Sequence, residues 1–153
     1  MATRSRRQPR SSAESAGVRY IESSALAAAL LERDAGALKS LRAPGRIVTS
    51  AVTMAETARA ILRARAAERL TAADERSAVR AVRRFERRCY VVAVTEAVLA
   101  RVRRPFPVEP VRTLDAVHLA TTELLGEPPA LVTIVTRVAR VRQNAEALGY
   151  AVE

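Results

Sequence analysis

Three acidic residues occupy positions at which a parallel β-sheet commonly builds a reactive site. Glu22 directly follows the apolar run 18–21, Glu56 lies within two helical turns of the run 46–49, and Asp115 opens a helix after a proline-rich loop. Side chains that follow parallel strands meet at one edge of the sheet. Clustered carboxylates repel one another, so a hard divalent cation such as Mg²⁺ or Mn²⁺ is their natural partner. The pattern predicts a catalytic metal site formed by Glu22, Glu56 and Asp115.

The sequence around Asp115 supports this interpretation, although structural alternatives remain open. Residues 114–120 read Leu-Asp-Ala-Val-His-Leu-Ala, which is unusually apolar for a helix that carries an acid. A buried carboxylate must be paired, metal-bound or neutral. In the structural alternative, Glu56 is an acid favoured near a helix N-terminus, Asp115 is a helix cap, and Glu22 is a loop acid beside Arg19.

The elements that must position these acids alternate along the chain. Apolar runs bounded by turn residues predict strands at 18–21, 46–49, 90–93, 131–134 and 150–152. Between them, helical patterns cover 25–31, 35–41, 51–68, 71–88, 95–104, 112–125 and 140–148. Ser23 or Ser24 is the expected cap of the first helix, and Gly149 of the last. This alternation predicts an α/β fold with a mostly parallel sheet covered by helices on both faces.

Composition excludes several classes of protein. One cysteine, Cys89, allows no internal disulfide, and one cysteine with one histidine cannot build a zinc site. No apolar run approaches the roughly 20 residues that span a bilayer, and the N-terminus has no apolar core of a secretory signal. We therefore expect a soluble, cytoplasmic protein that does not associate with a membrane.

The charge is strongly positive and unevenly distributed. The chain has 153 residues and a net charge of +10, and Lys39 is its only lysine among 26 basic residues. Residues 1–16 hold four arginines and one glutamate, so +7 remains for the rest of the chain. We interpret 1–16 as a disordered basic arm, either a solvated tail or a phosphate-binding one, and 17–153 as a single domain. Such an excess favours a polyanionic partner.

Four segments resemble the sequence blocks of PIN-domain ribonucleases. Residues 20–26 (Tyr-Ile-Glu-Ser-Ser-Ala-Leu) are similar to the opening of these enzymes, and residues 49–56 are similar to their second block, a strand followed by a helix with a glutamate. Residues 114–120 resemble the block Asp-Ala-x-His-aliphatic-Ala, and residues 140–149 resemble the helix that follows the fourth block. The resemblance covers about 18–153, and the size and two-helix insertion are similar to VapC toxins.

The resemblance implies a fold, an activity and partners. It implies a PIN-like three-layer α/β/α fold with a mostly parallel sheet of four to five strands. It implies a homodimeric endoribonuclease toxin that hydrolyses RNA with Mg²⁺ or Mn²⁺ and is neutralised by a VapB-type antitoxin. On this basis Ser24 and Thr136 are expected to lie beside the metal ligands and orient a carboxylate. His118, one turn after Asp115, is expected either to contact RNA phosphate or to be packed and hydrogen-bonded.

Two positions depart from the family pattern. The first acid is usually aspartate, whereas here it is Glu22, whose extra methylene displaces the carboxylate by about 1.5 Å from a cation that tolerates only small departures from its ligand distances. The place of the fourth acid is held by Val138, which cannot ligate a metal. Reduced or lost activity therefore remains open. The alternatives are a degenerate PIN domain that binds RNA or antitoxin without cleavage, and a non-enzymatic nucleic-acid-binding module.

A helix rich in arginine is the candidate RNA surface. Arginines recur at spacings of three, four and seven along 71–88, and Arg80, Arg84 and Arg87 are the expected RNA contacts. They would attract the RNA backbone without reading its sequence. The alternative is a solvated face of an arginine-rich chain. Aromatic residues make up only 3% of the sequence, so base stacking has few candidates.

Overall fold

The computed structural model describes residues 17–153, and the predicted basic arm at 1–16 lies outside them. The strands are β1 (Val18–Ile21), β2 (Arg46–Ser50), β3 (Tyr90–Val92), β4 (Val132–Val135) and β5 (Ala151–Val152). The helices are α1 (Ser23–Leu31), α2 (Ala35–Arg42), α3 (Ala51–Ala66), α4 (Ala72–Glu86), α5 (Glu96–Val102), α6 (Thr113–Glu123), the 3-10 turn η1 (Pro129–Leu131) and α7 (Ala139–Ala147). Among these helices none is both long and apolar enough to cross a membrane.

The strands form one parallel sheet in the order β3-β2-β1-β4-β5. Val18 of β1 pairs with Arg46 of β2 on one side and with Val132 of β4 on the other. The central strand β1 is buried along its whole length, as expected for a parallel sheet covered on both faces. The predicted parallel α/β architecture is confirmed.

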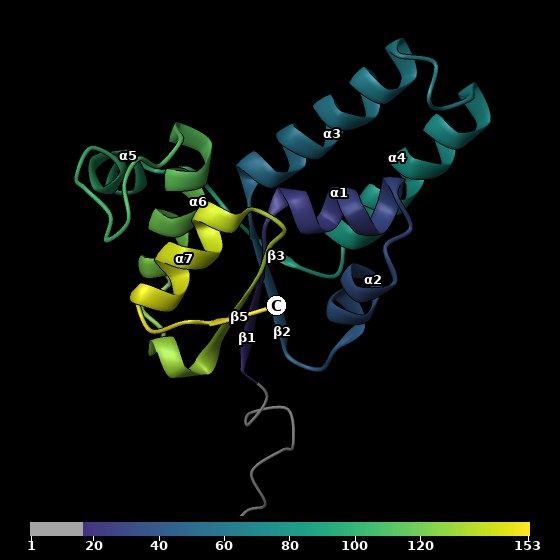
Figure 1. Cartoon of the computed structure of the whole chain (residues 1–153). Coiled ribbons are helices and arrows are strands. Elements are labelled where there is room, and N and C mark those ends of the chain that lie inside the picture. Colours follow the sequence, from purple (N-terminus) through teal and green to yellow (C-terminus); the bar gives the residue numbers. More distant parts are fainter. Residues whose placement is uncertain (1–16) are drawn as a thin grey trace, which may run out of the picture.

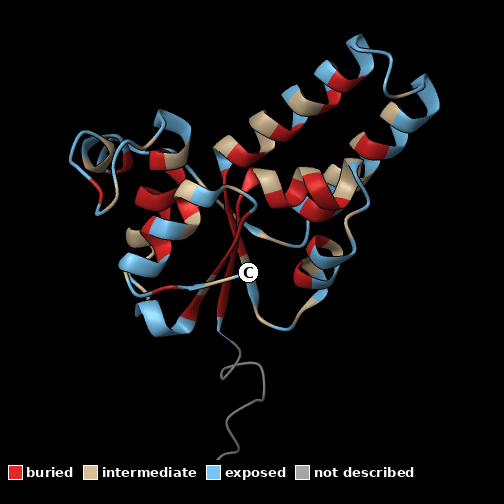
Figure 2. Cartoon of the chain, viewed as in Figure 1, coloured by how far each residue is buried: buried red, intermediate tan, exposed pale blue. Residues whose placement is uncertain are grey.

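Helices cover the two faces of the sheet in two groups. Figure 1 shows α1 to α4 on one side of the strands and α5 to α7 on the other, which gives three layers. Strand residues alternate between the faces, so Tyr20 packs in the cluster with α6 residues such as Val117, and Ile21 packs with Leu26 of α1. In Figure 2 the strands and the helix sides that face them are buried.

The helix termini follow local capping chemistry, with one correction. Thr71 and Asp74 form a reciprocal capping box at the start of α4. We predicted Ser23 or Ser24 as the cap of α1, but the cap is Glu22, whose carboxylate accepts from the Ser24 backbone N–H at 3.1 Å. The helix begins earlier because this longer acidic side chain reaches the free N–H groups of its first turn.

A buried arginine ties the central strand to the last residues of the chain. Arg19 is 7% exposed, and its guanidinium donates to both carboxylate oxygens of Glu153, at 3.2 and 2.6 Å. Its Nε donates to the Ser40 carbonyl at 3.2 Å. Glu153 is held in turn by backbone hydrogen bonds to Ile134 and Thr136 at 3.0 Å. The positive charge of Arg19 on β1 is therefore paired with Glu153 and is not left unpaired beside the apolar core.

Candidate active site

The candidate site lies at the carboxyl edge of the sheet, as the order of elements predicts. Glu22 follows β1 directly, Thr136 follows β4 directly, and Glu56 lies on α3, which begins immediately after β2. Helix α6 supplies Asp115 in its first turn and His118 one turn later. Because β1 pairs with both β2 and β4, the segments after these strands meet at one place.

Glu22 is the most enclosed acid of the site. It is 2% exposed, and its Oε1 accepts from the Ser23 hydroxyl at 2.6 Å and from the Ser24 backbone N–H at 3.1 Å. Its Oε2 accepts from the hydroxyls of Ser24 and Thr136, the latter at 2.9 Å. A buried carboxylate with this many donors is held in one orientation and satisfied. Ser24 and Thr136 thus occupy the positions that we predicted for orienting residues.

His118 bridges the two glutamates. Its Nε2 lies 2.8 Å from Glu56 Oε2 and 3.5 Å from Glu22 Oε1. One ligand atom from each of Glu22, Glu56 and His118 lies within 4.8 Å of the others, a separation that a single cation can bridge. Two converging carboxylates fit a hard divalent cation, and the imidazole nitrogen suits Mn²⁺ better than Mg²⁺.

Asp115 lies beside this cluster rather than within its closest group. The group of ligand atoms within 4.8 Å does not include the Asp115 carboxyl. Burial is the main cause that raises the pKa of Asp115, and the negative charge of Glu22 raises it further, followed by a smaller effect of Glu56. The three acids predicted from sequence are therefore close enough to repel one another, which is the condition that a bound cation would relieve.

Glu56 is held in its charged form. Partial burial acts to raise its pKa, but the hydrogen bonds of His118 and Ser23 stabilise the carboxylate, and the net pKa is below its usual value. An anionic Glu56 beside the enclosed Glu22 presents concentrated negative charge at the sheet edge. This charge arrangement suits a divalent cation and repels an unaccompanied phosphate.

The structure favours one of the two alternatives for His118 and adds two residues that we did not select from sequence. His118 is 1% exposed and both of its ring nitrogens are engaged, so it is packed and hydrogen-bonded and does not face RNA. Tyr20 was missed because it reads as an ordinary strand residue, and Ser23 because it reads as a helix cap. For Tyr20, the one signal in the sequence is its position in a strand, two residues before the acid Glu22.

Val138 occupies the place expected for a fourth acid. It is the residue before α7, its side chain packs against the main core cluster, and its backbone N–H donates to the Thr136 hydroxyl at 3.0 Å. The neighbouring Arg137 points its guanidinium to Asp34 at 2.9 Å instead. The segment after β4 therefore brings a hydroxyl to the site, through Thr136, but no carboxylate.

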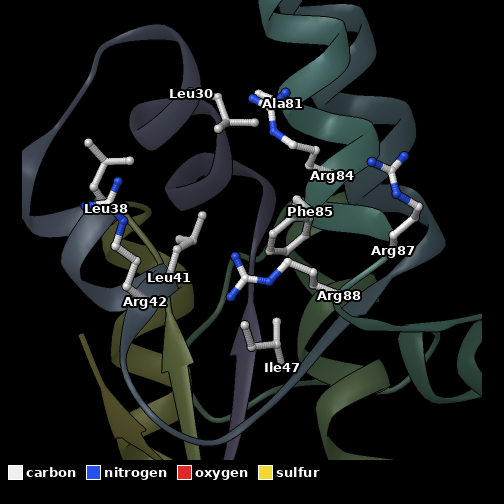
Figure 3. Close-up of a pocket in the computed structure, with 10 residues that line it drawn as sticks. All are labelled: Leu30, Leu38, Leu41, Arg42, Ile47, Ala81, Arg84, Phe85, Arg87 and Arg88. Carbon is white, nitrogen blue, oxygen red and sulfur yellow. The ribbon is translucent and has the colours of Figure 1, made fainter.

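Arginines at the carboxyl end of α4 and just after it line a separate pocket. A pocket of about 410 Å³ lies between α1, α2, β2 and α4. Figure 3 shows Arg84 and Arg87 among its lining residues. Its remaining lining residues are Leu30, Leu38, Leu41, Arg42, Ile47, Ala81, Phe85 and Arg88. Ile47 belongs to the amino-terminal half of β2, whereas the acids follow the carboxyl ends of the strands. Arg80 is exposed on α4 and does not line this pocket.

Comparison with solved structures identifies the fold. The chain is similar to VapC20 of Mycobacterium tuberculosis, described as a sarcin-ricin loop cleaving toxin, with a TM-score of 0.58 and 20% identity over 87% of this chain and 96% of that one. It is also similar to VapBC-1 from nontypeable Haemophilus influenzae, with a TM-score of 0.56 and 13% identity over 89% and 96%. At these identities the likeness establishes the three-layer fold.

Sequence comparison identifies the family. Ribonuclease VapC35 of Mycobacterium tuberculosis is 36% identical over 137 residues, which cover 87% of this chain and 93% of that protein. The same identity and coverage hold for VapC35 of strains CDC 1551 and H37Rv. The PIN domain model matches residues 19–142, a span that includes Glu22, Glu56 and Asp115. The chain therefore belongs to the PIN domain family, and within it resembles the VapC ribonucleases.

Proposed function

We propose that this protein is a VapC-type toxin: an endoribonuclease that hydrolyses RNA phosphodiester bonds with the help of a divalent cation. The observation that carries the proposal is the convergence of Glu22 and Glu56 at one sheet edge, with Asp115 beside them. The 36% identity to a VapC ribonuclease supports the same activity. An RNA-cleaving toxin acts where its substrate is, so we place the protein in the cytoplasm.

The three acids are the residues that would hold the cation. Glu22, Glu56 and Asp115 offer the oxygen ligands that Mg²⁺ and Mn²⁺ prefer. When bound, such an ion lowers the pKa of a water molecule and neutralises charge on the scissile phosphate. The chain's own part is orientation: the hydroxyls of Ser23, Ser24 and Thr136 fix the Glu22 carboxylate.

Reduced activity is the alternative that one specific observation favours. Val138, partly buried against the core cluster, stands where the family places an acid, so the site offers one carboxylate fewer. Fewer anionic ligands mean weaker binding of a hard cation. A domain of this kind would bind RNA or its partner and cleave slowly or not at all.

The test is RNA cleavage by the purified protein across a series of Mn²⁺ and Mg²⁺ concentrations. Wild type is compared with Asp115→Asn, and Glu146→Gln on the exposed side of α7 serves as the matched control. We expect cleavage that requires the metal, disappears in Asp115→Asn and persists in the control. Binding of Mn²⁺ without cleavage would support the degenerate alternative. If RNA binding needs no metal and is unchanged in Glu56→Gln, the result would instead support a non-enzymatic nucleic-acid-binding module.

The arginine-lined pocket is the surface that we propose for the antitoxin. Its floor is apolar, through side chains such as Leu41 and Phe85, and its rim is basic, through Arg42, Arg84 and Arg88. A partner with apolar side chains flanked by carboxylates complements this surface, whereas RNA would bring few apolar groups to fill the floor. A VapB-type antitoxin is the protein partner of a VapC toxin.

Homodimerisation remains a prediction of the family resemblance. Large apolar side chains stay exposed on several elements of the described chain, among them Leu62 of α3 at 48% and Leu99 of α5 at 39%. Burying such side chains in a symmetric interface would lower the free energy of the assembly. Sedimentation of the purified protein over a concentration series measures this directly, and a constant monomer mass would contradict it.

A further inference from the structure

His118 is the only histidine of the chain, and it is enclosed between a tyrosine and two acids. Its Nδ1 lies 2.9 Å from the Tyr20 hydroxyl, and its Nε2 lies 2.8 Å from Glu56 Oε2. Tyr20 and His118 are 0% and 1% exposed, so their contact is closed to water, whereas the Glu56 side chain is 26% exposed. The two rings meet edge to face, with centroids 6.0 Å apart.

The partners of the ring determine where its proton resides. A carboxylate only accepts hydrogen bonds, so the short contact with Glu56 requires a proton on Nε2. In the neutral ring, Nδ1 is then an acceptor, and the Tyr20 hydroxyl is its donor. The phenol oxygen itself lies against the hydroxyls of Ser50 and Thr121. A directed chain of hydrogen bonds therefore runs from Tyr20 through His118 to Glu56.

We propose that Tyr20 and His118 are positioning residues of the acid site: the Tyr20 hydroxyl donates to Nδ1 and fixes the ring, and the Nε2–H of that ring fixes the Glu56 carboxylate. The inference rests on the proposed metal-dependent function and specifies how the chain orients one of its acids. The histidine then acts through Glu56 rather than on the substrate.

The distances around His118 alone are compatible with two roles, a metal ligand and a residue that positions Glu56. Its Nε2 lies close enough to Glu22 and Glu56 to share a cation with them. To ligate, however, Nε2 would have to give up its proton and its hydrogen bond to Glu56, while Nδ1 faces Tyr20. In the wild-type protein the ring therefore supports a ligand, as hydrogen-bonded partners of metal-binding carboxylates commonly do.

The first experiment uses the metal-free protein. Because His118 is the only imidazole, its ring nitrogens are assigned without ambiguity in long-range ¹H–¹⁵N NMR spectra. We expect Nε2 to carry the proton and Nδ1 to be unprotonated. In Tyr20→Phe, which removes only the hydroxyl, we expect the Nδ1 resonance to shift because Nδ1 loses its hydrogen bond, while the proton stays on Nε2. In the control Tyr150→Phe, in a buried tyrosine of the same core cluster, both ring nitrogen resonances should keep their wild-type positions. A wild-type ring that carries a proton on Nδ1, or an Nδ1 resonance that is unchanged in Tyr20→Phe, overturns the inference.

The second experiment adds Mn²⁺ to the ¹⁵N-labelled protein. We expect pulsed EPR of wild type to show no directly coordinated imidazole nitrogen, and Tyr20→Phe to bind Mn²⁺ about 10-fold more weakly than Tyr150→Phe. A coordinated imidazole in wild type overturns the positioning role, as does an unchanged affinity in Tyr20→Phe. Failure of wild type to bind Mn²⁺ refutes the proposed function instead, and the metal-free spectra still decide the tautomer.

Discussion

The Thr136 hydroxyl donates a 2.9 Å hydrogen bond to Glu22 Oε2, although 114 positions separate the two residues in the chain. Glu22 follows β1 and Thr136 follows β4, and these strands are parallel neighbours in the sheet. Their carboxyl ends are therefore adjacent, and a residue just past one strand can support a residue just past the other. This hydrogen bond links Glu22 to the segment after β4, in which Val138 stands at the place of the family's fourth acid.

Removing the donors of Glu22 should weaken metal binding. Thr136→Val keeps the shape of the side chain and deletes the hydroxyl, so the carboxylate loses one of the bonds that orient it. We expect the affinity for Mn²⁺ to fall about 10-fold, as measured by calorimetry. Thr57→Val is the matched control, because the Thr57 hydroxyl is buried without a partner among residues 17–153. An equal loss of affinity in both variants would contradict the orienting role.

Restoring an acid at position 138 should strengthen metal binding. Val138 is the N-cap of α7, has extended backbone angles and makes no side-chain cap. Both Val138→Asp and Val138→Asn supply a cap worth about 1 kcal/mol, which offsets the lost apolar packing. Only the aspartate adds charge, so we expect tighter Mn²⁺ binding and faster RNA cleavage in Val138→Asp than in Val138→Asn. Equal behaviour of the two variants would show that this position does not face the cation.

The bond between Arg19 and Glu153 should make stability depend on pH. The hydrogen bond of Arg19 lowers the pKa of Glu153, with burial opposing it and Ser40 assisting. Its folded-state pKa is thus below the unfolded value of about 4.3, so the stabilisation is complete above that pH and is lost as pH falls through the folded-state pKa. Because the Glu153 side chain is 44% exposed and solvent screens part of the interaction, we expect Glu153→Gln to lower the free energy of unfolding by about 1 kcal/mol at pH 7.

Urea unfolding from pH 7 to pH 3 measures this effect. The difference between wild type and Glu153→Gln should shrink as pH falls below the unfolded pKa of about 4.3 and vanish below the lower folded-state pKa, where the glutamate is protonated in both states. Glu146→Gln is the control, because Glu146 forms an exposed pair with Arg142 at 3.9 Å. Such a pair contributes about 0.5 kcal/mol or less. A pH-independent difference at position 153 would show that charge is not its cause.

Charge reversal on α4 and just after it should separate RNA binding from antitoxin binding. Arg80 is exposed outside the pocket, whereas Arg88 lines it. In the Asp115→Asn background, which prevents cleavage, we expect Arg80→Glu to weaken RNA binding and to reduce its dependence on salt. We expect Arg88→Glu to reduce recovery of a co-expressed antitoxin instead. The RNA hypothesis for Arg80, Arg84 and Arg87 fails if charge reversal at all three leaves RNA retention unchanged.

Local sequence determined most of the secondary structure of this protein. The run Val18–Ile21 forms a strand with the predicted bounds, and Thr71 with Asp74 forms the cap that its spacing indicates, because such features depend on neighbours within one turn. The alternation of elements determined a parallel sheet, and strand ends determined the edge at which the acids gather. The motif around Asp115 indicated the PIN family, which the sequence match confirms.

Only the tertiary structure decided which atoms meet at that edge. Spacing along α6 placed Asp115 and His118 on one face, but the packing of α6 against β1 brought His118 rather than Asp115 into the closest group with Glu56. Tyr20 of β1 belongs to the site because its hydroxyl lies 2.9 Å from Nδ1 of His118 on α6. Distances between elements depend on how the side chains of many residues fill a shared core. The spacing of residues within one element does not determine that packing.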